Sequence, residues 1–332
     1  MTDLPGNPSI NRREFFRRAT KAGLSITAAA ALSVWLYDPR GPVAPAETDE
    51  ALVLLPDFSI PGLSSKMSIV TGEDRVKSVG VALKSLGGIE AFIGKGDRVL
   101  IKVNAAFALP ALLGATTHPQ LLGEVVRLCL QAGAASVTVT DNPINDPESC
   151  FTLTGIRQAA ESAGGKLILP REALFRATSP SGARLIRNWP LLYAPFQGVN
   201  KLIGIAPVKD HHRSGASMTM KNWYGLLGGR RNIFHQDIHN LIKELAMMVK
   251  PTLVILDGTT TMMTNGPTGG SLSDLKQTNM MIVGTDQVAV DAFGAGLLGK
   301  TVVQLPFLLK AQEAGLGTTD YEALHPVRTA TG

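Results

Sequence analysis

The feature that most constrains the fold is an alternation of strand-like and helix-like segments joined by short turns. Residues 97–103 have an apolar strand pattern, residues 118–132 a helix pattern with Pro119 near its start, and residues 136–140 a second strand pattern. Two parallel strands joined by a helix give this order, because the crossover returns the chain to the same end of the sheet. We therefore predict a three-layer α/β/α fold with a mostly parallel sheet.

Further segments continue this pattern toward the C-terminus. Helices are predicted at about residues 150–163, 237–249 and 286–298, and strands at residues 166–169, 199–206, 252–256 and 279–283. Residues 171–198 are rich in proline, arginine and serine and have weak periodicity. They are predicted to form an irregular excursion from a single α/β domain.

Polar residues follow five of the predicted strands. In chain order they are Asn104, then Asp141 and Asn142, then Lys209, His211 and His212, then Asp257, and finally Asp286. Ligands of open parallel sheets bind beyond the carboxyl ends of the strands. We therefore expect these side chains to gather at one edge of the sheet and to form a site there.

The stretch TMKNWYGLLGGRRNIFH, residues 219–235, combines cations, amides, glycines and aromatic residues. The side chains of Lys221, Asn222, Arg230 and Arg231 would make a positive pocket together with those of Lys209, His211, His212 and Arg213. Such a pocket suits phosphate, carboxylate or another oxyanion. Aromatic side chains of the stretch could stack on a ring of the ligand. The alternative is a set of solvated charges that flank a partly buried helix.

Histidines supply candidates for acid–base chemistry and for metal binding. His211 and His235 are predicted to transfer protons, with Asp257 as a catalytic carboxylate that orients them, because histidine titrates near neutral pH. His235 and His239 are four residues apart on one predicted helix face, so they could bind a metal together with Asp257 or Asp286. The alternative is an ordinary pair of histidines at the start of a helix.

Several enzyme classes lack their sequence signatures in this chain. Residues 259–270 form a polar, glycine-bearing segment after a predicted strand, and this segment could cover a ligand. It lacks the Lys-Ser/Thr ending of a phosphate-binding loop, no GxGxxG fingerprint follows a predicted strand, and no GxSxG motif is present. These absences argue against nucleotide hydrolysis, dinucleotide-dependent hydride transfer and serine hydrolysis.

The first 46 residues resemble an export signal. Arg12-Arg13 precede Glu14-Phe-Phe-Arg17, residues 22–37 form a moderately apolar run, and Ala44-Pro-Ala46 offers a cleavage site. We predict a twin-arginine signal peptide at 1–46 that engages the twin-arginine export machinery, and a mature domain at 47–332 in the periplasm. An uncleaved signal that anchors the chain in the membrane is one alternative, and a basic arm before an ordinary helix is another.

The net charge of +5 does not indicate nucleic-acid binding. Residues 1–46 contain six of the basic residues and three of the acidic ones, so most of the excess lies in the predicted signal. No nucleic-acid-binding motif is found in the rest of the chain. With two cysteines, Cys129 and Cys150, the chain cannot supply four thiolates to an iron–sulfur cluster, whereas a disulfide between them stays open.

Motifs along most of the mature chain resemble the domain-of-unknown-function family 362. They span residues 67–316 and comprise Val99-Leu-Ile-Lys-Val-Asn104, Thr116-Thr-His-Pro119, Asp141-Asn-Pro143, Pro207-Val-Lys209, Met220-Lys-Asn-Trp-Tyr-Gly-Leu-Leu227, Gly229-Arg-Arg231, Asp257-Gly258, Asn265-Gly-Pro267 and Gly284-Thr-Asp286. The resemblance adds Lys102, His118 and Asn265 to the predicted ligand-binding residues. Many members of this family carry a ferredoxin-like cluster module, which this chain lacks, so the resemblance implies only an association with redox chemistry.

Two hypotheses about function follow from these patterns. The first is an exported, redox-associated enzyme that binds an anionic small molecule or cofactor, and the mixture of bases, acids and amides at one edge favours it. The second is a non-catalytic periplasmic binding or accessory protein that uses the same pocket. The ligand-binding residues predicted for either are Lys102, Asn104, His118, Asp141, Lys209, Lys221, Asn222, Arg230, Arg231 and Asn265.

Overall fold

The computed structural model describes residues 12–23, 51–63 and 65–331. The chain divides into two compact units, residues 1–46 and residues 47–332. In the first unit residues 12–23 are helical, whereas most of the predicted apolar run and the predicted cleavage site lie outside the described residues. No helix among the described residues is both long enough and apolar enough to cross a membrane.

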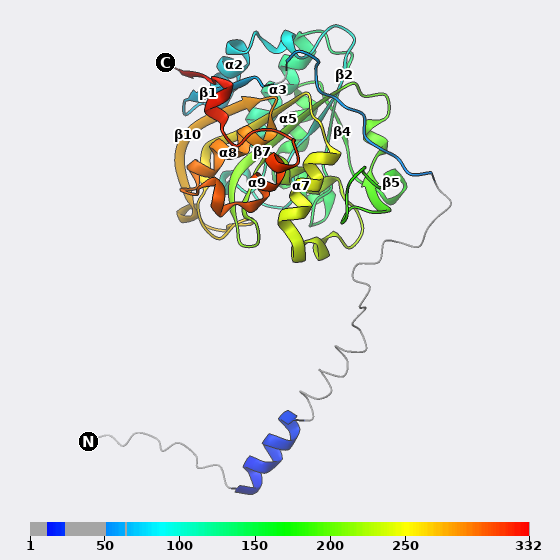
Figure 1. Ribbon diagram of the computed structural model, residues 1–332, viewed down its shortest axis with the longest axis vertical. Helices are drawn as coiled ribbons and strands as arrows, with labels where there is room; N and C mark the ends of the chain where they lie inside the picture. The colour runs from blue at the N-terminus through cyan, green and yellow to red at the C-terminus, as the bar shows by residue number, and fades with distance from the viewer. Residues whose placement is uncertain (1–11, 24–50, 64, 332) are drawn as a thin grey trace, which may run out of the picture. The chain divides into compact units, whose positions relative to one another are not determined.

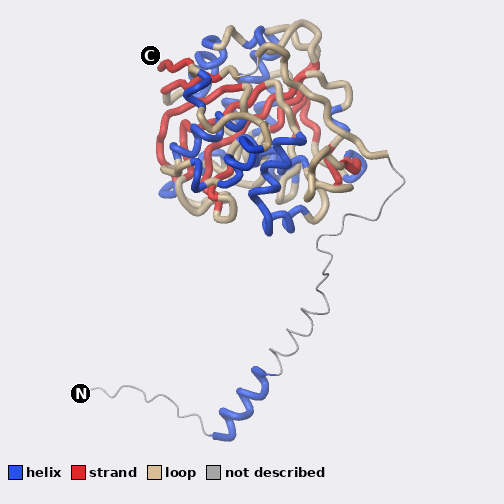
Figure 2. Tube along the Cα trace, in the orientation of Figure 1, coloured by secondary structure: helices blue, strands red, loops and turns tan. Residues whose placement is uncertain are grey.

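The second unit is built on one large mixed sheet. Within the described residues it has nine strands: eight lie in the order β11-β1-β10-β9-β7-β2-β3-β4, and β8 pairs with β7 (Figures 1 and 2). Their bounds are β1 (Met67–Thr71), β2 (Arg98–Lys102), β3 (Ser136–Thr140), β4 (Lys166–Ile168), β7 (Lys201–His211), β8 (Gly215–Ser217), β9 (Leu253–Met262), β10 (Leu275–Gly284) and β11 (Val327–Ala330).

Most of the strand pairs are parallel, as predicted. The pairs β4–β3, β3–β2, β2–β7, β7–β9 and β1–β11 are parallel, whereas β10 is antiparallel to both β9 and β1, and the short β8 is antiparallel to β7. The carboxyl ends of β2, β3, β7 and β9 therefore point to the same edge of the sheet. This edge is where the sequence predicted a site.

Helices cover both faces of the sheet and complete three layers (Figure 1). One face packs on α2 (Arg75–Ser85), α3 (Pro119–Gln131) and α5 (Ile156–Ser162), and the other on α7 (Ile238–Met248), α8 (Gln287–Leu297) and α9 (Pro306–Glu313). Successive strand residues alternate between the two cores, so Val99 and Ile101 join the first and Leu100 joins the second. The predicted α/β fold is confirmed.

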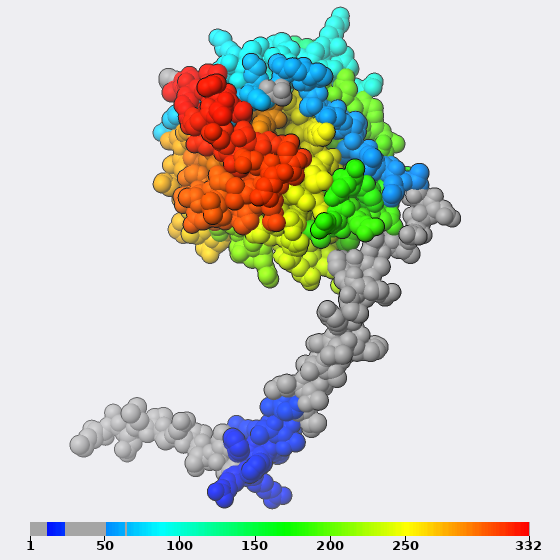
Figure 3. Space-filling model, in the orientation of Figure 1, coloured from blue at the N-terminus to red at the C-terminus, as the bar shows by residue number. Residues whose placement is uncertain are grey.

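Smaller elements complete the described chain. They are α4 (Pro147–Leu153), α6 (Thr219–Asn222), β5 (Phe175–Thr178), β6 (Trp189–Leu192), η1 (Ile89–Ala91), η2 (Ala111–Leu113), η3 (Glu172–Leu174), η4 (Ala194–Phe196), η5 (Trp223–Leu226), η6 (Arg231–Asp237), η7 (Leu272–Asp274), η8 (Val302–Gln304) and η9 (Tyr321–Leu324). The space-filling view shows the C-terminal segments and residues 51–63 sharing one face (Figure 3). Residues 51–63 are attached there by a backbone bond from Phe58 N to Lys250 O of 3.0 Å.

Three element predictions need correction. The helix predicted at 150–163 is two helices, α4 and α5, because Gly155 has φ 75° and interrupts the helical path. The segment 259–270 is not all loop, because β9 continues to Met262 by pairing with β10. The predicted excursion at 171–198 contains a two-stranded antiparallel sheet, β5–β6. Cys129 and Cys150 are buried free thiols, so they do not form a disulfide.

Candidate functional site

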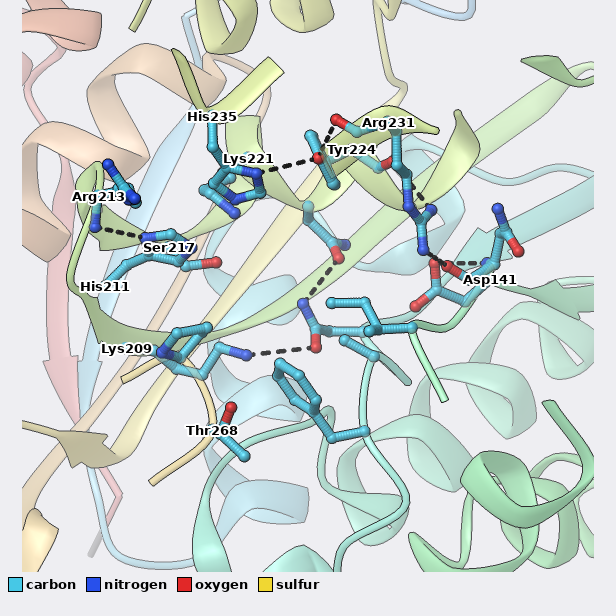
Figure 4. Close-up of a pocket in the computed structure, with 18 of the residues that line it drawn as sticks. Asp141, Lys209, His211, Arg213, Ser217, Lys221, Tyr224, Arg231, His235 and Thr268 are labelled. Carbon is cyan, nitrogen blue, oxygen red and sulfur yellow. Dashed lines mark hydrogen bonds between the residues drawn. The ribbon is translucent and has the colours of Figure 1, made fainter. Parts of the chain in front are cut away.

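A pocket opens at the carboxyl ends of β2, β3 and β7 (Figure 4). Its volume is about 410 Å³, which is within the usual range for small-molecule sites. The charged side chains that line it are five cations and one carboxylate: Lys102, Lys209, Arg213, Lys221, Arg231 and Asp141. This imbalance makes the pocket strongly positive.

Lys102 and Asp141 form the floor of the pocket. Lys102 Nζ lies 2.6 Å from Asp141 Oδ1, with 1% and 2% of the two side chains exposed. The same ammonium donates to Val103 O at 2.7 Å and to Asn222 Oδ1 at 2.9 Å, so all three of its donors are used. Burial lowers the pKa of Lys102, and the charge of Asp141 opposes that shift. This pair is a structural anchor whose donors are not available to a ligand.

Asp141 is also bonded on both oxygens by the backbone. Ala105 N donates to Oδ2 at 2.7 Å, and Asn142 N donates to Oδ1 at 2.9 Å. Gly225 passes so close that a Cβ there would lie 2.0 Å from Asp141 Oδ1 and 2.6 Å from Lys102 Nζ. Glycine at this position therefore lets the segment after α6 cross directly over the buried pair.

Asn222 and Asn104 connect the anchor to the rest of the pocket. Asn222 Oδ1 accepts from Lys102 Nζ and from Asn104 Nδ2 at 3.2 Å, while its own amide group donates to Ile205 O at 3.1 Å. Both residues were predicted as ligand-binding, and both line the pocket. Through these bonds the side chain of Asn222 links Lys102 of β2 to Ile205 of β7 at the floor of the pocket.

Arg231 spans the pocket wall as a clamp on the backbone. Its two terminal nitrogens donate to the carbonyl oxygens of Tyr224, Leu227, Asn142 and Pro143 at 2.7–3.3 Å. No carboxylate among the described residues pairs with it. Burial lowers its pKa, which the charge of Asp141 opposes. Arg231 thus adds positive potential to the pocket, while four of its N–H groups are bound to the protein.

Lys209 extends into the pocket from the far half of β7. Its ammonium donates to Ala115 O at 2.6 Å and makes a long contact of 3.5 Å with Asn104 Oδ1. It also lies 5.4 Å from the ring centre of Phe107. Burial, together with the charge of Lys221, lowers the pKa of Lys209 to about 7. At neutral pH this amine is about half protonated, and it has donors to spare.

Lys221 differs from the other buried lysines because its ammonium has no hydrogen bond or ion pair within the described residues. It is 8% exposed, comes from the last turn of α6, and its Nζ lies 5.0 Å from the ring centre of Tyr224. Burial and the charges of Arg231 and Lys102 lower its pKa to about 7. A buried amine with no polar partner is unfavourable unless a ligand completes it.

Hydrogen bonds to α8 hold the start of α6 in place. Thr219 N and Met220 N donate to the two carboxylate oxygens of Asp291 at 2.8 and 3.0 Å. Trp223 is buried with its indole N–H bonded to Gln287 Oε1 at 2.7 Å. The aromatic residues of the stretch therefore have different roles, because Trp223 packs in the core and Tyr224 lines the pocket.

His211 is held as a neutral ring whose free donor is Nε2. Its Nδ1 accepts the backbone N–H groups of Arg213 at 3.1 Å and Ser214 at 3.3 Å, so the ring hydrogen is on Nε2. Burial and the neighbouring cation Lys221 lower its pKa to about 2. His211 is therefore a fixed hydrogen-bond donor. The predicted role in proton transfer does not suit it.

His235 has the opposite arrangement. Its Nδ1 lies 3.0 Å from Asn232 O, which can only accept, so Nδ1 carries the hydrogen and Nε2 has a lone pair in the neutral ring. Tyr224 Oη lies 3.3 Å from Nδ1 and donates to Arg231 O at 2.5 Å. Burial and Lys221 lower the pKa of His235, and its ring stacks on His211 at 5.7 Å. Its Nε2 can accept a proton, as predicted for this residue.

Four of the predicted catalytic and ligand-binding residues do not line the pocket. Arg230 is exposed, and Asn265 donates to Asp274 at 2.6 Å. Asp257 lies within β9, where it pairs with Arg75 of α2 at 2.8 Å. His118 precedes α3, and its buried Nδ1 has no partner among the described residues. The assignment of Asp257 as catalytic is therefore corrected, because its charge is neutralised on the α2 side of the sheet.

The predicted metal site is not assembled. In the described parts of the chain no three His, Cys, Asp or Glu side chains lie close enough to bind a metal ion together. His239 stacks on Phe307 at 6.2 Å, and Asp286 caps α8 by accepting Val288 N at 2.8 Å and Ala289 N at 3.0 Å. The metal candidates His235, His239 and Asp286 thus belong to three different environments.

Some pocket residues were missed from the sequence. Phe107 and Ile144 supply apolar surface, and Ser217 comes from the β7–β8 hairpin. Arg213, expected in the positive pocket, and Thr268, from the segment expected to cover a ligand, both line it. Phe107 and Ile144 lie within four residues of polar strand endings, a signal that could have identified them. Ser217 had no such signal, because the strand was predicted to end at residue 206.

These features define an α/β protein with an electropositive pocket at the carboxyl end of a mostly parallel sheet. The chain belongs to the family described as Domain of unknown function (DUF362), whose model matches residues 99–296, more than half of the chain. Every residue that lines the pocket falls within this range. The family resemblance noted in the sequence is thereby confirmed.

Three proteins illustrate what the chain is similar to. A thylakoid-associated protein of Synechocystis sp. is 22% identical over 258 residues, which cover 75% of this chain and 78% of that protein. The lactate racemase apoprotein of Thermoanaerobacterium thermosaccharolyticum has a TM-score of 0.41 and 13% identity, over 73% of this chain and 58% of that one. A protein of Thermotoga maritima has a TM-score of 0.39 and 12% identity, over 69% and 59%. The chain spans less than two thirds of either solved structure.

Proposed function

We propose that this chain is an exported enzyme that binds an anionic small molecule in the pocket at the carboxyl ends of β2, β3 and β7. The observation that carries the proposal is the ratio of five lysine and arginine side chains to one carboxylate in a pocket of about 410 Å³. The single carboxylate is already paired with Lys102. A ligand with negative charge would supply the missing counter-charge.

The free donors of the pocket indicate how the anion would be held. Lys209 keeps unused N–H groups, Lys221 has no polar partner within the described residues, and His211 presents Nε2–H. Three donors of this kind suit a carboxylate, phosphate or sulfate group, because charge-assisted hydrogen bonds to oxyanions are about twice as strong as neutral ones. Phe107 and Ile144 would contact an apolar part of the ligand.

The lysines also support a catalytic role. An amine that titrates near pH 7 is well matched to proton transfer at neutral pH, because both of its protonation states are populated. Lys209 and Lys221 satisfy this condition, each with a pKa lowered to about 7 by burial and neighbouring cations. The proposed enzyme is redox-associated, as the family resemblance implies, and no residue of the pocket is assigned a redox role.

A non-catalytic binding protein is the second candidate, and one observation favours it. Asp257 is paired with Arg75 outside the pocket, and His211 is held neutral, so two of the three residues predicted to be catalytic are unavailable for proton transfer. Incubating the protein with candidate anions separates the two functions. Chemical conversion of the anion supports the enzyme, whereas stable retention of the unchanged anion supports capture.

The affinity for an anion is expected to fall as pH rises above about 7. In the ligand-free protein the pKa values of Lys209 and Lys221 are about 7. The anion binds the protonated form of each lysine, so above about pH 7 the two amines must take up protons before it can bind. The affinity should fall by up to about tenfold per pH unit for each lysine. Calorimetric titration with sulfate from pH 6 to pH 9 measures this, because sulfate does not titrate in the range. An affinity independent of pH would contradict the proposed roles of these lysines.

Export is proposed on the basis of the N-terminal sequence and can be tested in cells. Changing both Arg12 and Arg13 to lysine is expected to leave the protein in the cytoplasm, because the paired arginines are the recognition element of this route. Cell fractionation with immunoblotting measures the distribution. The matched control is Arg40→Lys, which keeps the same charge but lies outside the pair. Equal export of the double variant and the wild type would overturn the assignment.

A further inference from the structure

Three buried lysines meet in the pocket, and only one of them has an unengaged amine. Lys102 has three acceptors within 2.9 Å, and Lys209 has Ala115 O at 2.6 Å. Within the described residues Lys221 Nζ has only the ring face of Tyr224, at 5.0 Å. Its nitrogen therefore lies in the pocket without a hydrogen bond or ion pair from the described part of the chain.

The surroundings of Lys221 favour the free amine over the ammonium. Arg231 and Lys102 place positive charge beside it, and burial removes the water that would stabilise a third cation. At pH 7 about half of this residue is free amine, compared with on the order of one in a thousand for an ordinary lysine in water. An unbonded amine next to other cations is the arrangement that makes a lysine nucleophilic.

We propose that Lys221 forms an imine with the carbonyl carbon of a small oxo acid bound in this pocket. The inference rests on the proposed function, because the carboxylate of the oxo acid would be the anion held by Lys209 and by Nε2–H of His211. It deepens that function by naming the ligand class as a carboxylic acid with a nearby ketone or aldehyde group. Lys221 is then the covalent catalytic residue, and Lys209 the electrostatic anchor.

The step balances without any further reactant. The lone pair of Lys221 Nζ attacks the carbonyl carbon, a C–N bond forms, and the carbonyl oxygen takes up a proton to give a carbinolamine. Loss of this oxygen as water then gives the C=N bond. The amine loses two hydrogens in this sequence, and the departing water carries both of them. The imine then takes up one proton to become an iminium ion.

The pocket contains a group suited to the proton transfers of this step. His235 carries its hydrogen on Nδ1, bonded to Asn232 O, so its Nε2 lone pair is free to accept a proton from the attacking amine. Burial and the charge of Lys221 lower the pKa of His235. Both line the same cavity (Figure 4), and Phe107 and Ile144 contribute apolar surface to it.

Borohydride trapping tests the inference on the full chain. The protein is incubated with pyruvate at pH 7 and reduced with sodium borohydride, and the modified lysine is located by peptide mass spectrometry. Hydride converts the imine to a stable N-carboxyethyl-lysine. We expect the adduct at Lys221, with excess sulfate reducing its formation because both anions compete for the pocket. Labelling of Lys221 should exceed that of the exposed Lys77 and Lys84 by more than about tenfold, given its larger fraction of free amine.

Lys221→Arg is the decisive variant, because arginine keeps the positive charge but has no amine able to form an imine. Loss of the adduct with retained calorimetric binding of sulfate supports the inference. Trapping on Lys209 instead, or equal trapping on the exposed lysines, would overturn it. Saturable pyruvate binding with no adduct would reject the imine and leave the anion pocket standing, whereas no binding of either anion would reject both.

Discussion

Replacing Asp141 by alanine is expected to lower the free energy of unfolding by about 3–5 kcal/mol, because it leaves a buried lysine without its counter-charge. Asp141 Oδ1 lies 2.6 Å from Lys102 Nζ, and both side chains are almost fully buried. The change also leaves the backbone N–H groups of Ala105 and Asn142 without their acceptor. Urea denaturation followed by circular dichroism measures the loss.

An exposed ion pair provides the matched control for this prediction. Lys250 Nζ lies 3.3 Å from Asp57 Oδ2, with 58% and 50% of the side chains exposed. Lys250→Ala is expected to cost less than about 1 kcal/mol, since solvent screens such pairs. Replacing Lys102 and Asp141 together by methionine and leucine should recover part of the loss, because no buried charge is then left unpaired. An Asp141 variant as stable as the Lys250 variant would show that the buried pair is not an anchor.

Lys221→Met is expected to have opposite effects on stability and on binding. The ligand-free variant should melt at the same temperature as the wild type or higher, because methionine removes a cation that has no hydrogen bond among the described residues and is repelled by Arg231 and Lys102. Its affinity for sulfate at pH 6.5 should fall by roughly 10- to 100-fold, as one charge-assisted hydrogen bond of about 1.5–3 kcal/mol is lost. Differential scanning calorimetry and isothermal titration measure the two quantities.

Arg230→Met is the control for Lys221→Met. Arg230 belongs to the same cationic stretch but is exposed and does not line the pocket, so its replacement should leave sulfate affinity within about threefold, since it removes only a distant, screened charge. A large drop in the melting temperature of the Lys221 variant would mean that this lysine stabilises the fold. Unchanged affinity in that variant would remove it from the binding site.

The parts of the site that could be predicted from the sequence are those with local signals. The strands before Asn104 and Asp141 are short apolar runs that end in polar residues, and both endings reach the pocket. Lys221 and Arg231 also reach it, in a stretch whose mixture of cations and aromatics was the main indication of a site. The alternation of strand and helix predicts parallel strands, whose carboxyl ends meet at one edge of the sheet, so these segments were expected to lie together there.

Other features depend on contacts between distant segments and could not be predicted. β7 continues past residue 206 because β8 pairs with its far half, and this extension places Lys209 and His211 inside a strand. Arg231 donates to the carbonyl oxygens of four residues, and two of these residues lie almost ninety positions earlier in the sequence. Asp286 was misassigned for a different reason, since its position before a helix is a local capping signal that the sequence already contained.

The most direct test of an anion site in this pocket is a crystal structure of the protein grown or soaked with selenate, whose selenium gives an anomalous signal. We expect an anomalous peak in the pocket within hydrogen-bonding distance of Lys209 Nζ, Lys221 Nζ and His211 Nε2, and we expect this peak to be lost in Lys221→Met. Selenate bound only at exposed side chains, with no anomalous density in the pocket, would contradict an anion site at this edge of the sheet.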